Sequence, residues 1–129
     1  MGESRKRIVV IISSGSGDGG TKATLAFSWA CGALSMGREV MLMATADGTI
    51  WGLNGACEGI HTPGFEPLEK YVEQFKELGG ILCVCPPCLE FYCSVDKEFV
   101  ERGLRDGAET CGVARALNFA GENGQIINF

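Results

Sequence analysis

The chain has 129 residues, nearly half of them hydrophobic, and a formal net charge of −5. This length and composition predict one globular domain spanning residues 1–129, with a hydrophobic core of its own. The negative charge argues against nucleic acid as a partner, because neutralising phosphates requires clustered Lys and Arg, and no apolar run approaches the length of a membrane span.

Strand and helix patterns alternate along the first part of the chain. Arg7–Ile12 is a continuous β-branched run, typical of a parallel strand buried on both faces. Thr21–Met36 is an apolar helical segment, and Gly37 is placed to end it in the left-handed conformation. A second strand is predicted at Val40–Ala44. The glycine-rich stretch Thr45–Thr62 shows neither the spacing of apolar residues typical of a helix nor that typical of a strand.

Three apolar residues stand out in this glycine-rich stretch: Ile50, Trp51 and Leu53. Such side chains are awkward on the surface of a monomer. We therefore expect them at a subunit interface or over the functional site.

The second part of the chain continues the alternation. Its clearest helix is Glu66–Leu78, in which apolar residues recur at i, i+3, i+4 and i+7. The remaining elements are a strand from Ile81 to the Pro86-Pro87 pair, a helix from Ser94 to about Glu101, a strand at Thr110–Val113, a helix at Ala114–Phe119 and a strand at Gln125–Ile127. This order predicts a three-layer α/β/α sandwich with a mostly parallel sheet of about five strands and flavodoxin-like topology.

Cysteine usage is the most unusual feature of the sequence. Four of the seven cysteines lie between Ile81 and Cys93. An odd number of cysteines without a recognisable secretion signal favours a reducing compartment and thiols rather than a disulfide framework. These thiols are expected to be either reactive groups or buried hydrophobic side chains.

Cys85 is the strongest candidate for a reactive thiol. It stands at or just past the carboxyl end of a strand, because Pro86 and Pro87 cannot continue a sheet ladder. Ligands and chemistry gather at that edge in open α/β sheets. If Pro87 begins a helical turn, the free N–H groups of that turn face Cys85 and lower the pKa of its thiol.

The other cysteines are weighed by their positions. Cys31 and Cys57 stand alone and are expected to be buried, and Cys83 and Cys111 fall in predicted strands and are expected in the core. A zinc site would have to use four cysteines crowded into one segment, where structural zinc sites use two separated pairs. No metal or other cofactor is therefore predicted; the rejected zinc set is Cys83, Cys85, Cys88 and Cys93.

Two other motifs receive a simpler interpretation. Gly15, Gly17 and Gly20 form a G-x-G-x-x-G between a strand and a helix, but no acidic residue closes the second strand as in dinucleotide sites. A strand-to-helix turn is favoured, and a nucleotide-binding regulatory module using this loop remains an alternative. His61, the single histidine, lies in a loop flanked by glycine and proline and is expected to be exposed.

The pattern resembles the DsrE/DsrF-like family over nearly the whole chain. The resemblance rests on the strand that leads into Cys85-Pro86-Pro87-Cys88 and on the segments Ala23-Thr24-Leu25-Ala26-Phe27, Gly37-Arg38-Glu39-Val40-Met41-Leu42-Met43-Ala44-Thr45-Ala46-Asp47-Gly48 and Glu109-Thr110-Cys111-Gly112. It implies a cytoplasmic sulfur-relay protein, trimeric or hexameric, that carries sulfur as a persulfide or thiosulfonate on Cys85, with Cys88 as the neighbouring possibility. Its implied partners are sulfur-donor and sulfur-acceptor proteins.

A second thiol would release the sulfur. If Leu89–Tyr92 forms a helical turn, Cys93 could return to within disulfide reach of Cys85, about 4.4–6.8 Å between Cα atoms. Pro87 is expected to limit the approach of Cys88. The function predicted is sulfur carrier or sulfurtransferase, with slow turnover in the absence of an acceptor protein; a thiol-disulfide redox module using Cys85 and Cys88 is the alternative.

Overall fold

The computed structural model describes residues 6–92 and 101–129. Five strands and four α-helices are described in these ranges. The strands are β1 (Arg7–Ile12), β2 (Glu39–Ala44), β3 (Ile81–Val84), β4 (Ala108–Thr110) and β5 (Gln125–Asn128), and the α-helices are α1 (Thr21–Ser35), α2 (Leu68–Glu77), α3 (Pro86–Tyr92) and α5 (Val113–Ala120). Two 3₁₀ segments, η1 (Ser16–Asp18) and η2 (Ala46–Gly52), follow β1 and β2.

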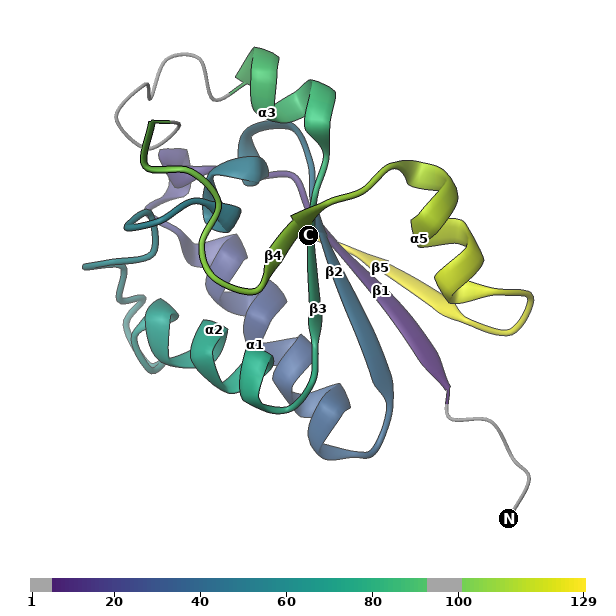
Figure 1. Cartoon of the computed structure of the whole chain (residues 1–129). Helices are drawn as coiled ribbons and strands as arrows, with labels where there is room; N and C mark the ends of the chain where they lie inside the picture. Colours follow the sequence, from purple (N-terminus) through teal and green to yellow (C-terminus); the bar gives the residue numbers. More distant parts are fainter. Residues whose placement is uncertain (1–5, 93–100) are drawn as a thin grey trace.

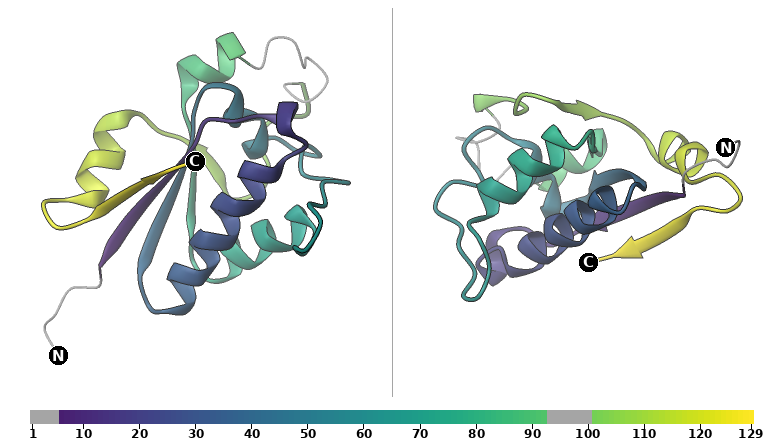
Figure 2. Two further views of the ribbon diagram at one scale, coloured as in Figure 1. Left: turned by 180° about the vertical axis from the view of Figure 1, so that it is seen from behind. Right: turned by 90° about the horizontal axis from the view of Figure 1, so that it is seen from below.

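The five strands form one parallel sheet in the order β4-β3-β2-β1-β5. The chain moves in one direction from β1 to β4 and then returns to the far side of β1. Because crossovers between parallel strands are right-handed, this reversal puts α1 and α2 on one face and α5 on the other (Figures 1 and 2). The predicted three-layer α/β/α sandwich is confirmed; its likeness to flavodoxin lies in the layers, since flavodoxin itself has the order 2-1-3-4-5.

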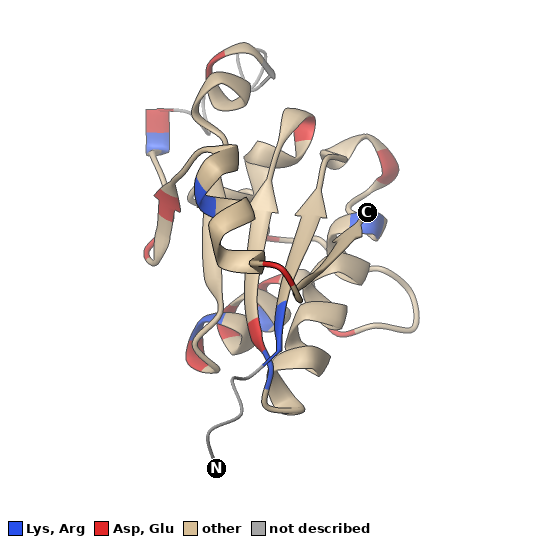
Figure 3. Cartoon of the chain, turned by 90° about the vertical axis from the view of Figure 1, so that its right-hand side faces the viewer, with Lys and Arg blue, Asp and Glu red and all other residues tan. Residues whose placement is uncertain are grey.

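In β1, β2 and β3, charged residues stand only at the amino ends of β1 and β2 (Figure 3). Arg7 and Glu39 stand at the amino ends of β1 and β2 and form an ion pair of 2.9 Å. The residues that follow them in these two strands are buried almost without exception. Burial on both faces explains why the strands read as continuous hydrophobic runs rather than as alternating ones.

The two helices on one face bury different kinds of side chain. α1 packs small residues such as Ala23, Ala26 and Ala30 on the sheet, with Phe27 fully buried among them. α2 begins at Leu68, two residues later than predicted, and buries Leu68, Val72 and Phe75. Phe27 and Phe75 meet edge to face with 5.6 Å between ring centroids, which joins the two helices.

The apolar residues of the glycine-rich stretch are in the core of this chain. Ile50 and Trp51 lie on η2 and Leu53 follows it, and all three are at most 4% exposed. The prediction of a subunit interface is wrong, because glycines at 48 and 52 let η2 approach the sheet; a Cβ on Gly52 would stand 2.3 Å from Val84. The other expectation was that these residues lie over the functional site. It fits better, since α3, which follows Cys85, packs against η2.

Two other expectations about the second part of the chain change. A fourth strand is present, but its predicted bounds Thr110–Val113 are wrong: β4 ends at Thr110 and Val113 already begins α5. The reason is that β3, the strand with which β4 pairs, ends at Val84 before the two prolines, so little ladder remains to extend β4. The predicted helix Ser94–Glu101 falls mostly outside the described residues, as does Cys93.

Candidate functional site

Cys85 follows the last residue of β3 directly. Its backbone N–H donates to the carbonyl of Ala44 at 3.0 Å, which holds it against the end of β2. Its carbonyl accepts from Leu89 N–H at 2.9 Å, so Cys85 also stands at the start of α3. The side chain is half-buried. A fixed backbone with an accessible sulfur at the carboxyl edge of a sheet is a suitable place for a reactive thiol.

Cys88 lies beside Cys85. The two sulfur atoms are 2.8 Å apart, and the Cys85 thiol donates to Cys88. The expectation that Pro87 limits this approach is wrong, because α3 begins at Pro86 and takes both prolines into its first turn. Proline suits that position, since the N–H it lacks would be unpaired there. One helical turn then carries Cys88 back to the residue that precedes the helix.

The environment of Cys85 acts on its pKa in opposite directions. Burial, followed by the hydrogen bond that its thiol donates to Cys88, raises the pKa of Cys85 above the ordinary cysteine value. The backbone N–H of Cys88 lowers it, as the helix-turn argument predicted, but the raising causes are larger. The hypothesis that the pKa of Cys85 is lowered is therefore wrong while Cys85 and Cys88 are both thiols and hydrogen-bonded to each other.

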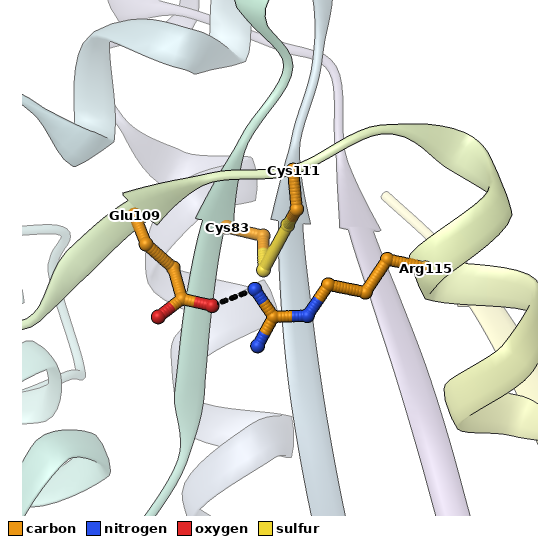
Figure 4. The surroundings of a disulfide bond; sticks show 4 residues. All are labelled: Cys83, Glu109, Cys111 and Arg115. Carbon is orange, nitrogen blue, oxygen red and sulfur yellow. Dashed lines mark ion pairs between the residues drawn. A yellow bond between two sulfur atoms is a disulfide. The ribbon is translucent and has the colours of Figure 1, made fainter.

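Cys83 and Cys111 are joined by a disulfide, with 5.7 Å between their Cα atoms. Both are buried, as predicted, at 0% and 7% exposure, but they were expected as thiols. Sequence reasoning missed the pair because it did not show that β3 and β4 are neighbours. Figure 4 shows the disulfide on the sheet face that also carries the ion pair between Glu109 of β4 and Arg115 of α5.

This disulfide also divides the zinc set that the sequence argument rejected, because a disulfide sulfur is not a thiolate ligand. Within the described ranges, no three His, Cys, Asp or Glu side chains are grouped so that they could hold a metal ion. Separately, none of the helices described in residues 6–92 and 101–129 is long and apolar enough to cross a membrane.

In the glycine-rich loop after β1, backbone N–H donors are already hydrogen-bonded to a side chain of the same loop. The Asp18 carboxylate accepts from the backbone N–H groups of Gly20, at 2.9 Å, and Lys22, at 3.1 Å. These are donors that a phosphate at the start of α1 would use. Gly15 and Gly20 have packing reasons of their own, since a Cβ there would stand 2.8 Å from Asp47 O and 2.4 Å from an Ile60 methyl.

The remaining candidates are placed as the sequence indicated. Cys31 and Cys57 are buried, and burial raises the pKa of their thiols to about 11 and about 12. His61 is exposed, and its Nε2 lies 2.7 Å from the carbonyl oxygen of Phe65. None of the three is brought next to the Cys85–Cys88 pair by an interaction within the described residues.

Comparison with known proteins agrees with this architecture. Residues 6–129 match the model of the DsrE/DsrF-like family. The crystal structure of the YchN protein from E. coli is similar over 98% of this chain and 100% of that one, with a TM-score of 0.69 and 15% sequence identity. At that identity the likeness shows the fold. No curated protein sequence matches the chain.

Proposed function

The chain belongs to the DsrE/DsrF-like family, and from this premise we propose that it is a sulfur carrier or sulfurtransferase whose sulfur is held on Cys85. The family implies a sulfur-relay role with protein partners. The finer proposal is that Cys85 holds sulfane sulfur as a persulfide or thiosulfonate and passes it to a thiol of an acceptor protein.

The observation that carries the proposal is the position of Cys85. It is the half-buried thiol that follows β3, and its backbone is fixed to β2 on one side and to α3 on the other. Among the cysteines described, those at 31 and 57 are buried thiols and those at 83 and 111 are disulfide-bonded. Cys85 and Cys88 are thus the described free thiols that a partner protein can reach.

The chemistry of loading requires only the thiolate. Cys85–S⁻ attacks the sulfane sulfur of a donor and forms a new S–S bond, and the rest of the donor leaves with the electrons of the broken bond. The product is Cys85–S–S⁻, or a thiosulfonate when the sulfur carries a sulfonate group. Transfer follows when the acceptor thiolate attacks the outer sulfur and Cys85 leaves as a thiolate.

Cys88 is supported as the second thiol by its 2.8 Å separation from Cys85. Its thiolate could attack Cys85 after loading, which releases the outer sulfur as hydrosulfide and leaves a Cys85–Cys88 disulfide. Cys93 stays a proposal from sequence alone, because it lies outside the described residues. Replacing Cys93 with Ser should leave loading intact and slow release if Cys93 is the resolving thiol.

The test is intact mass measurement after incubation with polysulfide, thiosulfate or tetrathionate. We expect an added sulfur species on the wild-type protein that dithiothreitol removes. Protein that gains no mass from any of the three donors, while its thiols still react with iodoacetamide, would contradict sulfur carriage.

A second function, thiol-disulfide exchange, is favoured by the same pair of sulfurs. A disulfide bond is about 2.05 Å long, so a 2.8 Å separation requires little movement to close it. A redox module would form the Cys85–Cys88 disulfide with oxidised glutathione and gain no sulfur from polysulfide. Mass measurement after each treatment separates the two functions.

We also propose a single domain that acts in the cytoplasm as a trimer or hexamer. Apolar side chains that stay exposed on the described part of the chain support self-association: Trp29, Met36, Val113 and Leu117 are 56–70% exposed. Light scattering on the purified protein measures the mass of the assembly, and a monomeric mass would contradict this part of the proposal.

A further inference from the structure

Four of the described cysteines gather where β3 ends. The register pairs Cys83 with Glu109 and Val84 with Thr110. The ladder extends one residue further, because Cys111 N–H donates to the carbonyl of Val84 at 3.1 Å. That carbonyl belongs to the peptide bond that joins Val84 to Cys85, so the backbone of Cys111 lies next to that of Cys85. Cys85 therefore has a free thiol beside it in α3, and the disulfide-bonded Cys111 lies next to its backbone just past the end of β4.

The spacing permits exchange between these sulfurs. Neighbouring strands lie about 4.8 Å apart, which is within the Cα separations of about 4.4–6.8 Å that disulfides span. Residues two apart along a strand share a face of the sheet, and Cys85 still bonds to β2 through its N–H, which indicates the face on which Cys83 holds Cys111. Cys83 lies on this face as well, two residues before Cys85.

We propose that these four cysteines form an internal thiol-disulfide relay, in which Cys83–Cys111 accepts electrons from the Cys85–Cys88 dithiol. In the first step Cys85–S⁻ attacks the sulfur of Cys111. A Cys85–Cys111 disulfide forms, the Cys83–Cys111 bond breaks, and Cys83 leaves as a thiolate. The proton of Cys85 goes to solvent and Cys83 takes one back.

In the second step the Cys88 thiolate attacks the sulfur of Cys85. A Cys85–Cys88 disulfide forms and Cys111 leaves as a thiolate, which takes up the proton that Cys88 gave to solvent. Two electrons and two protons have moved from the outer pair of thiols to the inner pair. No outside oxidant or reductant is required, because one disulfide is exchanged for another.

The two pairs of cysteines differ in how easily a reagent in solution reaches them. The Cys83–Cys111 disulfide is at most 7% exposed, whereas Cys85 and Cys88 are half-buried. A reductant in solution therefore reaches the inner disulfide through the outer pair. Conversely, the inner disulfide can close the outer pair without an oxidant reaching it from solution, which would take Cys85 out of sulfur loading until it is reduced.

The relay rests on the reactive Cys85 of the proposed function but not on its sulfur cargo. Its test uses no sulfur donor, so failure of sulfur loading and failure of the relay are separate results. Glutathione is a suitable reductant, because it is too bulky to enter a buried site directly.

The experiment follows release of the Cys111 thiol after the protein is oxidised with diamide and then exposed to glutathione. Samples are quenched with iodoacetamide, and alkylation is measured on the tryptic peptide 106–115, in which Cys111 is the sole cysteine. We expect release at least tenfold slower in Cys85→Ser than in the wild type, and an unchanged rate in Cys31→Ser, which removes a buried thiol of α1. Equal rates in Cys85→Ser and the wild type would overturn the relay.

A second variant tests the reach of Cys85 directly. Replacing both Cys83 and Cys88 with Ser leaves Cys111 and Cys85 without their nearest partners, and diamide, which takes up two electrons and two protons, should then join Cys111 to Cys85. Tandem mass spectrometry of the linked peptides identifies the pair. Cys111 that stays a free thiol in this double variant, under conditions in which diamide closes the Cys85–Cys88 pair of the wild type, would show that Cys85 does not reach it and would end the proposal.

Discussion

The loops that follow β1 and β3 end at the same edge of the sheet, yet they use their polar groups in opposite ways. In the loop after β1, the Asp18 carboxylate already accepts from the N–H groups at the start of α1. After β3, where Cys85 leads directly into α3, the Cys85 and Cys88 sulfurs face each other and stay half exposed. A motif predicts a ligand only where its donors or nucleophiles remain available.

η2 supports both loops. The Trp51 indole N–H donates to the carbonyl of Ser14 at 2.8 Å, in the loop after β1. The same 3₁₀ segment packs against α3, in the region of Cys85 and Cys88. The two loops therefore share a scaffold, and variants that disturb one of them at a time show how far they are independent.

The largest expected effect is that of Trp51→Ala, which removes a fully buried side chain beneath both loops. Loss of its packing and of the hydrogen bond should lower the free energy of unfolding by about 3–5 kcal/mol. Urea unfolding measures this change. The control is Trp51→Phe, which keeps an aromatic ring but leaves the Ser14 carbonyl without its donor and should cost less. Similar losses in both variants would mean that the hydrogen bond, rather than the packing, dominates.

Gly20→Ala should have the next largest effect and should act on the first loop alone. Gly20 has φ +84°, and a Cβ would stand 2.4 Å from an Ile60 methyl. The positive φ and the short contact both disfavour a side chain at this position. We therefore expect the free energy of unfolding, measured in urea, to fall by about 1–3 kcal/mol. Gly17→Ala is the matched control, because a Cβ there meets nothing within 4 Å, and it should change stability by less than about 0.5 kcal/mol.

Sulfur loading should distinguish these glycines from the thiol pair. In the folded fraction of both glycine variants, Cys85 should load as in the wild type. Loss of loading in Gly17→Ala, which disturbs no packing, would link the first loop to the chemistry and revive a ligand-binding role for it.

The smallest effect is expected from Cys88→Ala, as a shift in the pH dependence of the Cys85 thiol. Replacing Cys88 removes the thiol whose hydrogen bond and charge raise the pKa of Cys85, while the backbone N–H that lowers it remains. The pKa of Cys85 should fall, although burial still raises it. The rate of alkylation by iodoacetamide should therefore reach its midpoint at lower pH than in the wild type. A midpoint that moves upward would show that Cys88 stabilises the Cys85 thiolate.

Much of the fold could be predicted because its signals are local. β1 has the predicted bounds, α1 ends one residue early, and Cys85 lies at the end of its strand as the two prolines indicated. What could not be predicted depends on which elements become neighbours. The Cys83–Cys111 disulfide requires β3 beside β4, and the burial of Trp51 requires η2 to turn back onto the sheet.

The prediction that Cys88 stays away from Cys85 was wrong for a different reason. The sequence argument treated Pro87 as an obstacle to the turn, whereas proline is favoured in the first turn of a helix. Starting α3 at Pro86 makes the four residues from Cys85 to Cys88 a single turn with both sulfurs on one side. A CxxC with two central prolines is therefore compatible with close sulfurs when a helix begins inside it.

The central claim is that sulfur is held on Cys85, and site mapping of the loaded protein tests it most directly. Wild-type protein, Cys85→Ser and Cys88→Ser are treated with polysulfide or tetrathionate, digested and analysed by tandem mass spectrometry. We predict a dithiothreitol-sensitive adduct on Cys85 in the wild type and in Cys88→Ser, and no adduct in Cys85→Ser. An adduct that persists in Cys85→Ser, or that maps only to Cys31, Cys57 or Cys111, would contradict the account.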